Sequence, residues 1–385
     1  MSDISLPYSK ANPFLATIKE RYSLCRTGSK KNTQHIVLDL KGSGISYQVG
    51  DSIGVFPVND PALISRTLQA MKATGAEKVT NRHTGEQVLL YDLLEKKVDV
   101  TDVTRKLLSE LAQRQSNPQK KEKLESLIAE GNRDALKDFQ AHHEVWDTLL
   151  EHHEVIFTPQ EICNLLLPLL PRFYSIASSM NAVGEEVHLT VALLAYEANG
   201  HARRGVCTHY LCALAPMDQP VVPIYIQPHH GFTVPTDPSA SLIMIGPGTG
   251  IAPFRAFMQE RIQRQDPGRN WLFFGEWTGS HEFFYEEYWR ALEQSGKLRL
   301  DLAFSRDQDY KIYVQHRMLE HGEELFQWLE SGSYIFVCGD AHRMAKDVEA
   351  ALHKIVQEHG KMDEASAKEY VKRLRADKRY VRDVY

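Results

Sequence analysis

The sequence predicts a multidomain α+β protein, in which an antiparallel β-barrel with an all-helical insert precedes a doubly wound parallel α/β domain. Three observations support this prediction. Short segments rich in β-branched residues begin the chain, helical periodicity then replaces them, and from residue 240 onward apolar strands alternate with helices. The 385 residues suit two or three domains.

The barrel is predicted in two parts. Gly, Ser and Lys turns separate the first short strands, and strand character returns after residue 156. Short strands at this spacing are typical of a small antiparallel barrel. The predicted strands are 14–18, 35–40, 52–56, 173–177, 186–194 and 221–226, and the predicted domain comprises 12–59 and 154–235.

The segment 60–153 is predicted to be a packed helical insert. Asp60 and Pro61 suit a helix cap and a first helical position, and apolar residues follow them at helical spacing. Further helical patterns cover 90–97, 104–114, 120–130, 133–142 and 145–153.

The last domain, 236–385, is predicted to hold a parallel sheet. The apolar strand 242–245 runs into a Gly-rich turn, and a helix follows at 253–264. Short buried strands alternating with helices indicate a doubly wound sheet. The further strands are 271–275, 298–305 and 334–338, and the further helices are 282–295, 315–331 and 343–360.

Composition argues against several classes of function. The formal net charge of −5 disfavours nucleic acid as a partner, because phosphate binding needs a basic surface. No run of 18 apolar residues is present, so we expect no membrane segment. The five cysteines are scattered, and the histidine pairs at 142–143 and 152–153 lie on a polar helical stretch, so we predict no metal site. A reducing, cytoplasmic setting is expected.

The sharpest motif is the turn from Gly246 to Gly250, between a buried strand and a helix. Gly248 and Gly250 let the backbone approach a pyrophosphate closely, and the helix N-terminus supplies free N–H groups. A turn without a ligand is the alternative, but the strand–turn–helix setting favours a dinucleotide.

Two weaker motifs come earlier in the chain. Arg172-Phe173-Tyr174-Ser175 places a cation, two aromatic rings and a hydroxyl on a strand, which by itself is an ordinary amphipathic strand. Gly205-Val206-Cys207-Thr208 precedes a helical pattern at 209–214 and suits a phosphate, although a simple helix cap at Thr208 also explains it.

A basic cluster follows the strand 298–305. It consists of Ser305, Arg306, Lys311, Tyr313 and Gln315. Such a cluster can clamp the 2′-phosphate of NADP, or it can be a solvated loop. Glu276, just past the second strand, is a competing signal, because an acidic residue there favours the ribose of NAD. The residues alone leave this choice open.

Two features near the end of the chain have equally plain alternatives. Cys338 ends a strand at the sheet edge where ligands bind, yet most cysteines are simply buried. The chain ends in Tyr385, and most termini fray unless such a ring covers something flat.

Taken in this order, the motifs resemble the ferredoxin–NADP reductase superfamily and, through the helical insert, its diflavin branch. The resemblance covers about 12–385. Within the branch, the stretch 270–275 and the ending Arg382-Asp383-Val384-Tyr385 are most similar to sulfite reductase flavoproteins. This resemblance implies FAD and NADPH as cofactors.

The resemblance also implies the site residues. The FAD residues would be Arg172, Phe173, Tyr174, Ser175, Thr190, Val191, Ala192, Tyr196, Gly205, Val206, Cys207, Thr208 and Tyr385. The NADPH residues would be Gly248, Thr249, Gly250, Ser305, Arg306, Lys311, Tyr313, Gln315 and Asp347, and the family's choice of NADP outweighs Glu276. Ser175, Cys338 and Asp383 would be the catalytic group that positions the nicotinamide, and Tyr385 would stack on the flavin ring.

The implied function is an NADPH-dependent FAD reductase of sulfite reduction and cysteine biosynthesis. The branch normally carries an FMN domain, and here the reductase motifs begin near residue 12, so we expect a separate electron acceptor. It would be a sulfite reductase haemoprotein or a flavodoxin-like or ferredoxin-like carrier. The alternatives are a general NADPH-dependent flavodoxin, ferredoxin or haemoprotein reductase, a non-catalytic module that binds flavin nucleotide, and a piece of a longer diflavin enzyme.

Overall fold

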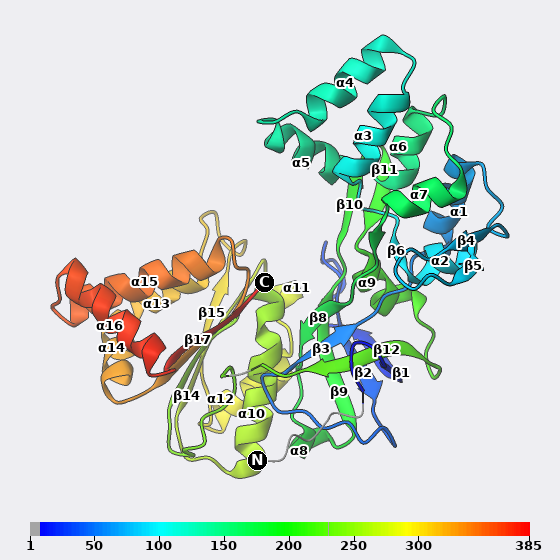
Figure 1. Cartoon of the computed structure of the whole chain (residues 1–385). Helices are drawn as coiled ribbons and strands as arrows, with labels where there is room; N and C mark the ends of the chain where they lie inside the picture. Colours follow the sequence, from blue (N-terminus) through cyan, green and yellow to red (C-terminus); the bar gives the residue numbers. More distant parts are fainter. Residues whose placement is uncertain (1–7, 230) are drawn as a thin grey trace. The chain divides into compact units, whose positions relative to one another are not determined.

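The computed structural model of the protein describes residues 8–229 and 231–385. The chain forms two compact units (Figure 1). The first unit comprises the described residues up to Gly54, Phe173–Ala192 and the described residues of Pro216–Tyr385. The second unit comprises Val55–Arg172 and Leu193–Ala215, so the chain passes from one unit to the other four times.

A six-stranded sheet forms one half of the first unit. Its strand order is β8-β3-β12-β1-β2-β9. The pairs β1–β2, β1–β12 and β2–β9 are antiparallel, which confirms the predicted antiparallel sheet. The backbone N–H of Ala177, just after β8, donates to the carbonyl of His188 in β9 over 2.8 Å, so the two edges of the sheet meet as in a barrel. The strands are β1 (Phe14–Ser23), β2 (Thr33–Asp39), β3 (Ser52–Val55), β8 (Arg172–Ser175), β9 (Glu186–Ala192) and β12 (Pro220–Gln227), and the short helix α8 (Met180–Val183) connects β8 to β9.

The other half of the first unit is a five-stranded sheet with the order β15-β14-β13-β16-β17. All four pairs of neighbouring strands are parallel, which confirms the doubly wound sheet. The strands are β13 (Leu242–Ile245), β14 (Asn270–Glu276), β15 (Arg299–Phe304), β16 (Tyr334–Gly339) and β17 (Tyr380–Val384).

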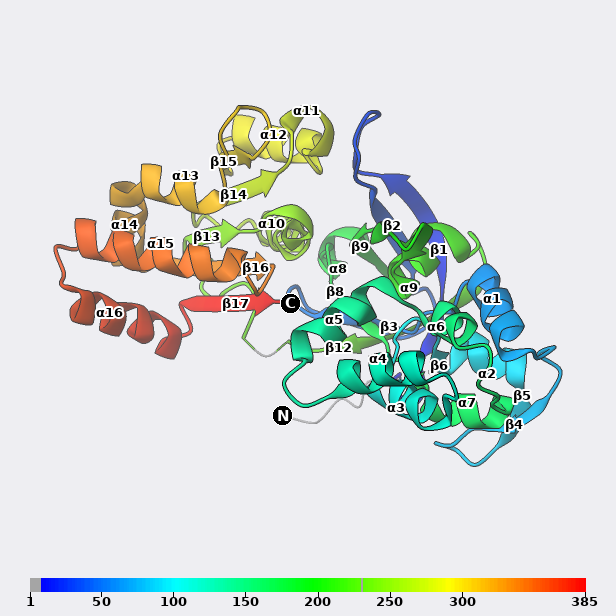
Figure 2. The ribbon, with the colours of Figure 1, turned by 90° about the horizontal axis from the view of Figure 1, so that it is seen from above.

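Helices cover both faces of this sheet (Figure 2). Successive strand residues point to opposite faces, so β13 divides its apolar side chains between two cores. Ile243 and Ile245 pack with α13 (Val314–Glu320), α14 (Gly322–Glu330), α15 (Met344–His359) and α16 (Glu364–Ala376). Leu242 and Met244 pack with α10 (Ala252–Arg264) and α12 (Glu286–Gln294).

The second unit is mostly helical and has its own apolar core, which includes Ile64, Leu108 and Leu149. Asp60 caps its first helix through a bond from the N–H of Ala62, as the sequence predicts. Its helices are α1 (Pro61–Met71), α2 (Leu90–Lys96), α3 (Arg105–Arg114), α4 (Pro118–Ile128), α5 (Arg133–His142), α6 (Val145–Glu151), α7 (Pro159–Leu165) and α9 (Val206–His209), with a π-helix at Tyr210–Leu214. Its strand pairs are β4 (Lys78–Thr80) with β5 (Gln87–Leu89), β6 (Val98–Asp99) with β7 (Leu167–Pro168), and β10 (Ala195–Ala198) with β11 (His201–Arg204).

Several predicted elements differ from the structure. The helix predicted at 282–295 is divided into α11 (Gly279–Glu282) and α12, because Tyr285 takes the left-handed conformation at φ 58°. The helix predicted at 315–331 is divided at Gly322, where a Cβ would lie 2.7 Å from the ring of His359. The prediction that strands resume at residue 156 overlooked α7, whose start carries a capping box of Thr158 and Glu161.

A buried polar chain joins the two sheets of the first unit. Thr190 and His35, on neighbouring strands β9 and β2, both bond the hydroxyl of Tyr285 at the start of α12, over 2.7 and 2.9 Å. His35 also bonds His188 over 3.2 Å, and His188 bonds the carboxylate of Glu186 over 3.1 Å. Burial, reinforced by the nearby Arg255 cation, lowers the pKa of His35 to about 2, and burial lowers the pKa of His188 to about 4.

Two absences hold for the part of the chain that the structure describes. No helix there has both the length and the apolar character that crossing a bilayer requires. Nor do three or more His, Cys, Asp or Glu side chains gather there in a way that could hold a metal ion.

Candidate active site

The Gly-rich turn lies at the carboxyl end of β13, and its glycines are required by close contacts. A Cβ on Gly246 would lie 2.6 Å from the ring of Phe254, and one on Gly250 would lie 2.1 Å from the carbonyl oxygen of Cys338. Gly248 has φ 59°, a conformation that favours glycine. The turn continues as a 3₁₀ turn, Gly248–Ile251, into α10. Glycine therefore allows the tight, closely packed turn between a strand and a helix that a pyrophosphate site uses.

The three predicted catalytic residues lie together, with Ser175 and Cys338 both beside the carboxylate of Asp383. Asp383 of β17 is the register partner of Cys338 in β16. The hydroxyl of Ser175, the last residue of β8, donates to Asp383 Oδ2 over 2.7 Å, and the Cys338 thiol lies 3.9 Å from the same oxygen. Burial, reinforced by the Asp383 charge, raises the pKa of Cys338 well above its usual range, so the thiol stays protonated at neutral pH.

The end of the chain is ordered at the same place. The N–H of Tyr385 donates to the carbonyl of Gly339 over 3.1 Å, and its own carbonyl accepts from the N–H of Ala341 over 3.0 Å. The hydroxyls of Tyr385 and Thr249 are 2.9 Å apart. As a residue, Tyr385 remains 60% exposed.

A hollow of about 510 Å³ continues along the carboxyl edge of the parallel sheet. Gly248, Ser305, Arg306, Lys311, Tyr313, Gln315 and Asp347 line it, so the predicted cluster does come together. Asp347 accepts a bond from the Gln315 amide over 3.3 Å. Arg306 lies flat against Trp277, with its guanidinium carbon 3.4 Å from the ring centroid.

The same hollow contains Lys31, a residue that the sequence reasoning missed. Its Nζ bonds both carboxylate oxygens of Glu276, over 2.6 and 2.7 Å. The two residues are 245 positions apart, and no local pattern in the sequence marks a lysine between two strands as part of this hollow. The acidic side chain that favoured NAD in the sequence is therefore already paired.

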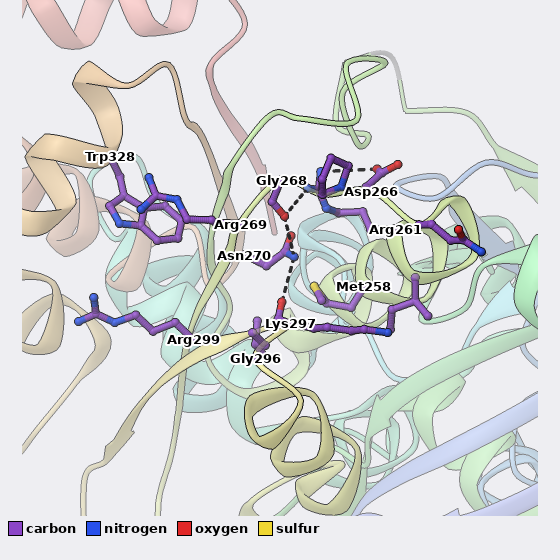
Figure 3. A pocket seen from close by; sticks show the side chains of 14 residues that line it. Met258, Arg261, Asp266, Gly268, Arg269, Asn270, Gly296, Lys297, Arg299 and Trp328 are labelled. Carbon is purple, nitrogen blue, oxygen red and sulfur yellow. Dashed lines mark hydrogen bonds and ion pairs between the residues drawn. The ribbon is translucent and has the colours of Figure 1, made fainter.

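A second hollow of similar volume lies at the opposite edge of the parallel sheet (Figure 3). Asn270 and Arg299, which line it, are the first residues of β14 and β15. Arg261 is buried there and donates to the carbonyls of Ala240 and Gly268, over 2.9 Å each. Ligands of doubly wound sheets bind at the carboxyl ends of the strands, so this hollow is not the coenzyme site.

The predicted FAD residues of the first unit differ in exposure. Phe173 is 53% exposed, Tyr174 is half-buried and Ala192 is exposed. Thr190 and Val191 have buried side chains, and the Thr190 hydroxyl is bonded to Tyr285.

The predicted FAD residues of the second unit are Arg172, the first residue of β8, Tyr196 on β10, and Gly205, Val206, Cys207 and Thr208 at the start of α9. Gly205 is the N-cap of α9, and its carbonyl accepts from the N–H of His209, so Thr208 lies inside the helix and the alternative interpretation, a helix cap at Thr208, is wrong. The Thr208 hydroxyl donates to the Gly205 carbonyl over 3.0 Å and accepts from the N–H of Leu194 over 3.2 Å. A Cβ on Gly205 would lie 3.0 Å from that of Leu194, so the turn is too tight for a larger residue. Val206 and Cys207 form the first turn of α9.

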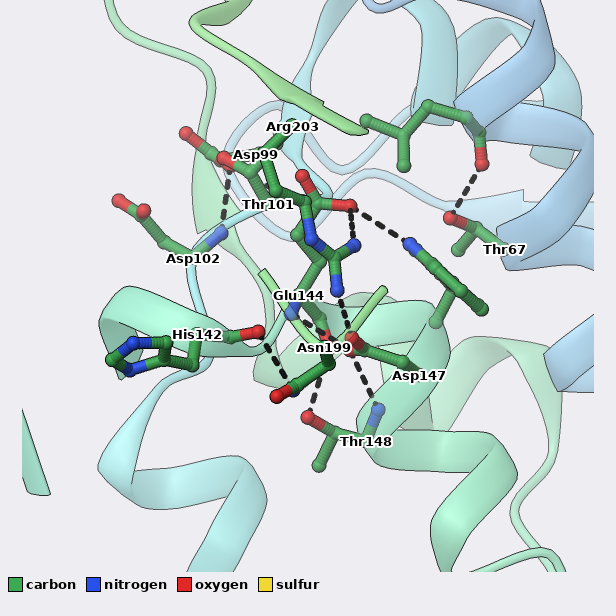
Figure 4. A network of polar contacts seen from close by, with 12 residues as sticks. Thr67, Asp99, Thr101, Asp102, His142, Glu144, Asp147, Thr148, Asn199 and Arg203 are labelled. Atoms are coloured by element: carbon green, nitrogen blue, oxygen red, sulfur yellow. Dashed lines mark hydrogen bonds and ion pairs between the residues drawn. The ribbon is translucent and has the colours of Figure 1, made fainter. Parts of the chain in front are cut away.

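The hairpin β10–β11, which carries Tyr196, is held by a buried cation (Figure 4). Arg203 is 2% exposed and donates to Glu144 over 2.6 Å and to Asp147. These two acids form the capping box of α6. Elsewhere in the same unit, the exposed Arg172 donates to the carbonyl of Leu170 over 3.1 Å and lies 3.9 Å from Asp99.

Comparison with known proteins decides the family. The family described as "FAD binding domain" matches residues 6–210, and the one described as "Oxidoreductase NAD-binding domain" matches residues 244–350. The chain belongs to this FAD-binding family. It is a flavoprotein oxidoreductase with one domain for FAD and one for NAD(P).

Similar curated proteins are sulfite reductase [NADPH] flavoprotein alpha-components. The chain is 40% identical over 379 residues to the one from Bacillus subtilis, and 42% identical to those from Vibrio cholerae and Aliivibrio fischeri over 379 and 380 residues. These matches cover 98% of the chain and 62%, 60% and 61% of the relatives. The chain thus spans about three fifths of the length of the relatives it matches.

Proposed function

We propose that this flavoprotein oxidoreductase takes hydride from NADPH and passes electrons to a separate carrier or to a sulfite reductase haemoprotein. The observation that carries the proposal is the meeting of Ser175, Cys338 and Asp383 beside a hollow lined by Arg306 and Lys311. Bound FAD supplies a two-electron hydride acceptor, and the residues supply position and charge.

Each residue has a defined part in this proposal. Asp383 holds the Ser175 hydroxyl over 2.7 Å and places a negative charge where the nicotinamide gains positive character. The Cys338 thiol is buried and protonated, so it acts by contact and not as a nucleophile. Arg306 and Lys311 bind the 2′-phosphate, for which a planar guanidinium is suited.

An anaerobic absorbance titration of the purified protein with NADPH, and separately with NADH, tests hydride acceptance. We expect the flavin band to bleach quickly with NADPH and slowly with NADH. A protein that takes up no FAD, or whose FAD NADPH does not reduce, would overturn the enzyme proposal.

The names of the relatives support a sulfite reductase haemoprotein as the acceptor. Stopped-flow mixing of the reduced protein with a sulfite reductase haemoprotein, a flavodoxin and a ferredoxin tests this part. We expect rapid reoxidation by at least one of them. Rapid transfer to the flavodoxin or the ferredoxin, with none to the haemoprotein, would instead support a general reductase with no part in sulfite reduction.

A further inference from the structure

We propose that Lys31 determines the coenzyme preference of this chain by neutralising Glu276. This inference rests on the proposed function, in which the hollow beside the parallel sheet takes NADPH. It assigns a role in coenzyme selectivity to a residue on the loop between β1 and β2, two strands of the six-stranded antiparallel sheet.

Glu276 occupies a position where an acid opposes the proposed choice of coenzyme. It is the last residue of β14, at the carboxyl edge of the sheet. An ionised side chain there accepts bonds from a ribose 2′-hydroxyl and repels a 2′-phosphate. The carboxylate also lies close to the Gly-rich turn, since a Cβ on Gly248 would be 3.6 Å from Glu276 Oε1.

Lys31 removes this opposition. Its Nζ lies 2.7 Å from Glu276 Oε1 and 2.6 Å from Oε2, and the Glu276 side chain is only 5% exposed. The N–H of Trp277 donates to Oε2 over a further 2.7 Å. Three of the roughly four acceptor sites of the carboxylate are therefore taken, and the Lys31 cation neutralises the charge that would repel a 2′-phosphate.

The same lysine adds to the cationic wall that faces the ligand. Its Nζ lies 4.5 Å from the ring centroid of Trp277, the ring on which Arg306 stacks. The N–H of Arg306 bonds the carbonyl of Trp277 over 2.8 Å. Lys31, Glu276, Trp277 and Arg306 thus form one continuous group.

Charge across the hollow explains why one lysine has a large effect. Four cations (Lys31, Arg306, Lys311 and Arg343) and three carboxylates (Glu276, Asp340 and Asp347) line it. Loss of Lys31 leaves equal numbers of each sign and frees the Glu276 charge. A dianionic 2′-phosphate is affected more than a hydroxyl, because Coulomb energy scales with the charge of the ligand.

The test measures ligand binding to the FAD-loaded protein by calorimetry. Adenosine 2′,5′-bisphosphate and adenosine 5′-monophosphate are the probes, because they differ only in the 2′-phosphate. The variants are Lys31→Ala, Glu276→Gln and the double variant, with Lys31→Arg as the conservative replacement. Lys30→Ala, at the exposed neighbouring residue, is the matched control.

We expect Lys31→Ala to lower the preference for the bisphosphate about tenfold or more, by the strength of a charge-assisted pair. Glu276→Gln in the same chain should restore most of that preference, and Lys31→Arg and Lys30→Ala should keep it. If the double variant prefers the bisphosphate as weakly as Lys31→Ala does, Lys31 contacts the phosphate directly. If Lys31→Ala keeps the wild-type preference, Lys31 has no role in it. Either result overturns this inference but leaves the proposed function standing. A wild-type protein that binds both probes equally would overturn the proposed NADPH preference, and the inference with it.

Discussion

Asp383 receives two donors on one oxygen, and this arrangement makes it the most informative single residue. The Asp383→Asn change keeps the size of the side chain but removes the charge, because the amide oxygen can still accept from Ser175 and Cys338 but is a neutral acceptor. We expect flavin reduction by NADPH to slow about 100-fold, the effect of losing one charge that stabilises the reacting groups, with FAD content unchanged. Stopped-flow absorbance checks this, with Cys25→Ala, outside the site, as the control. Loss of FAD together with the rate would assign Asp383 a structural role instead.

Arg306 tests the 2′-phosphate assignment at the same scale. Removing a charge-assisted bond should cost about 1.5–3 kcal/mol, so Arg306→Ala should weaken NADPH about 10- to 100-fold and NADH much less. Arg269→Ala is the matched control, since Arg269 also stacks on a tryptophan, 4.1 Å from the ring centroid of Trp328, but at the opposite edge of the sheet. Equal losses for the two coenzymes in steady-state kinetics would contradict the assignment.

Residues that lie near a recognisable strand end could be predicted from the sequence, and distant partners could not. Cys338 lies near the carboxyl end of β16 and Gly250 in the turn after β13, and parallel strands bring their carboxyl ends to one edge. Lys31 reaches Glu276 from 245 positions away, and only the three-dimensional structure shows that the pair forms. The competing signal from Glu276 could therefore be seen in the sequence, whereas its neutralisation could not.

At the scale of an element, Arg203 fastens the hairpin β10–β11 to the start of α6 (Figure 4). Replacing it with Met leaves the buried Glu144 and the half-buried Asp147 without their cation, and breaking such a buried group costs about 3–5 kcal/mol. We expect Arg203→Met to lower the melting temperature clearly, whereas Arg133→Ala, at an exposed site on α5, changes it little. An unchanged melting temperature in circular dichroism would show that the cluster does not stabilise the hairpin.

The polar chain between the two sheets predicts a pH dependence. His35 and His188 stay neutral in the folded protein, whereas in the unfolded chain they take up protons below their usual pKa of 6.5. The free energy of unfolding should therefore fall as pH drops from about 6.5 toward 4, by up to about 1.4 kcal/mol per pH unit for each histidine. Melting temperatures between pH 7 and 5 check this. The melting temperature of His35→Gln should fall less steeply, as pH drops, than that of the wild type. The melting temperature of His342→Gln, a change at an exposed site, should follow that of the wild type. Parallel curves for all three proteins would contradict the prediction.

The type of an element could be predicted where its apolar residues repeat regularly along the sequence. The ends of an element could not be predicted where contacts with distant residues determine them. The strand 242–245 and the helix 133–142 match β13 and α5 without a shift, because a Gly-rich turn follows the strand and Gly131-Asn132 precedes the helix. Between α13 and α14, Gly322 leaves no room for a Cβ beside His359 of another helix, and no local pattern reports this contact. Likewise, β17 is ordered because it pairs with β16, although a terminus by itself is expected to fray.

For the whole molecule, the cores of the two units are separate. The apolar cores on both faces of the parallel sheet belong to the first unit, and the helical core belongs to the second. Each unit therefore has its own source of cooperativity. The four chain crossings favour unfolding of the two units together. They occur at or near the ends of β3, β8, β9 and β12, so unfolding of the second unit releases the ends of strands in the six-stranded sheet. The balance between these two effects can be measured.

We expect the separate cores to prevail, so that calorimetry of the wild type resolves two unfolding transitions. Leu108 and Leu352 are both fully buried, one in each unit, and truncating a buried leucine costs about 2–5 kcal/mol. Leu108→Ala should lower one transition and Leu352→Ala the other, each serving as the control for the other. If both changes lower a single transition by similar amounts, the four crossings couple the units. The contacts of Arg203 with Glu144 and Asp147 would then stabilise the first unit as well as the second.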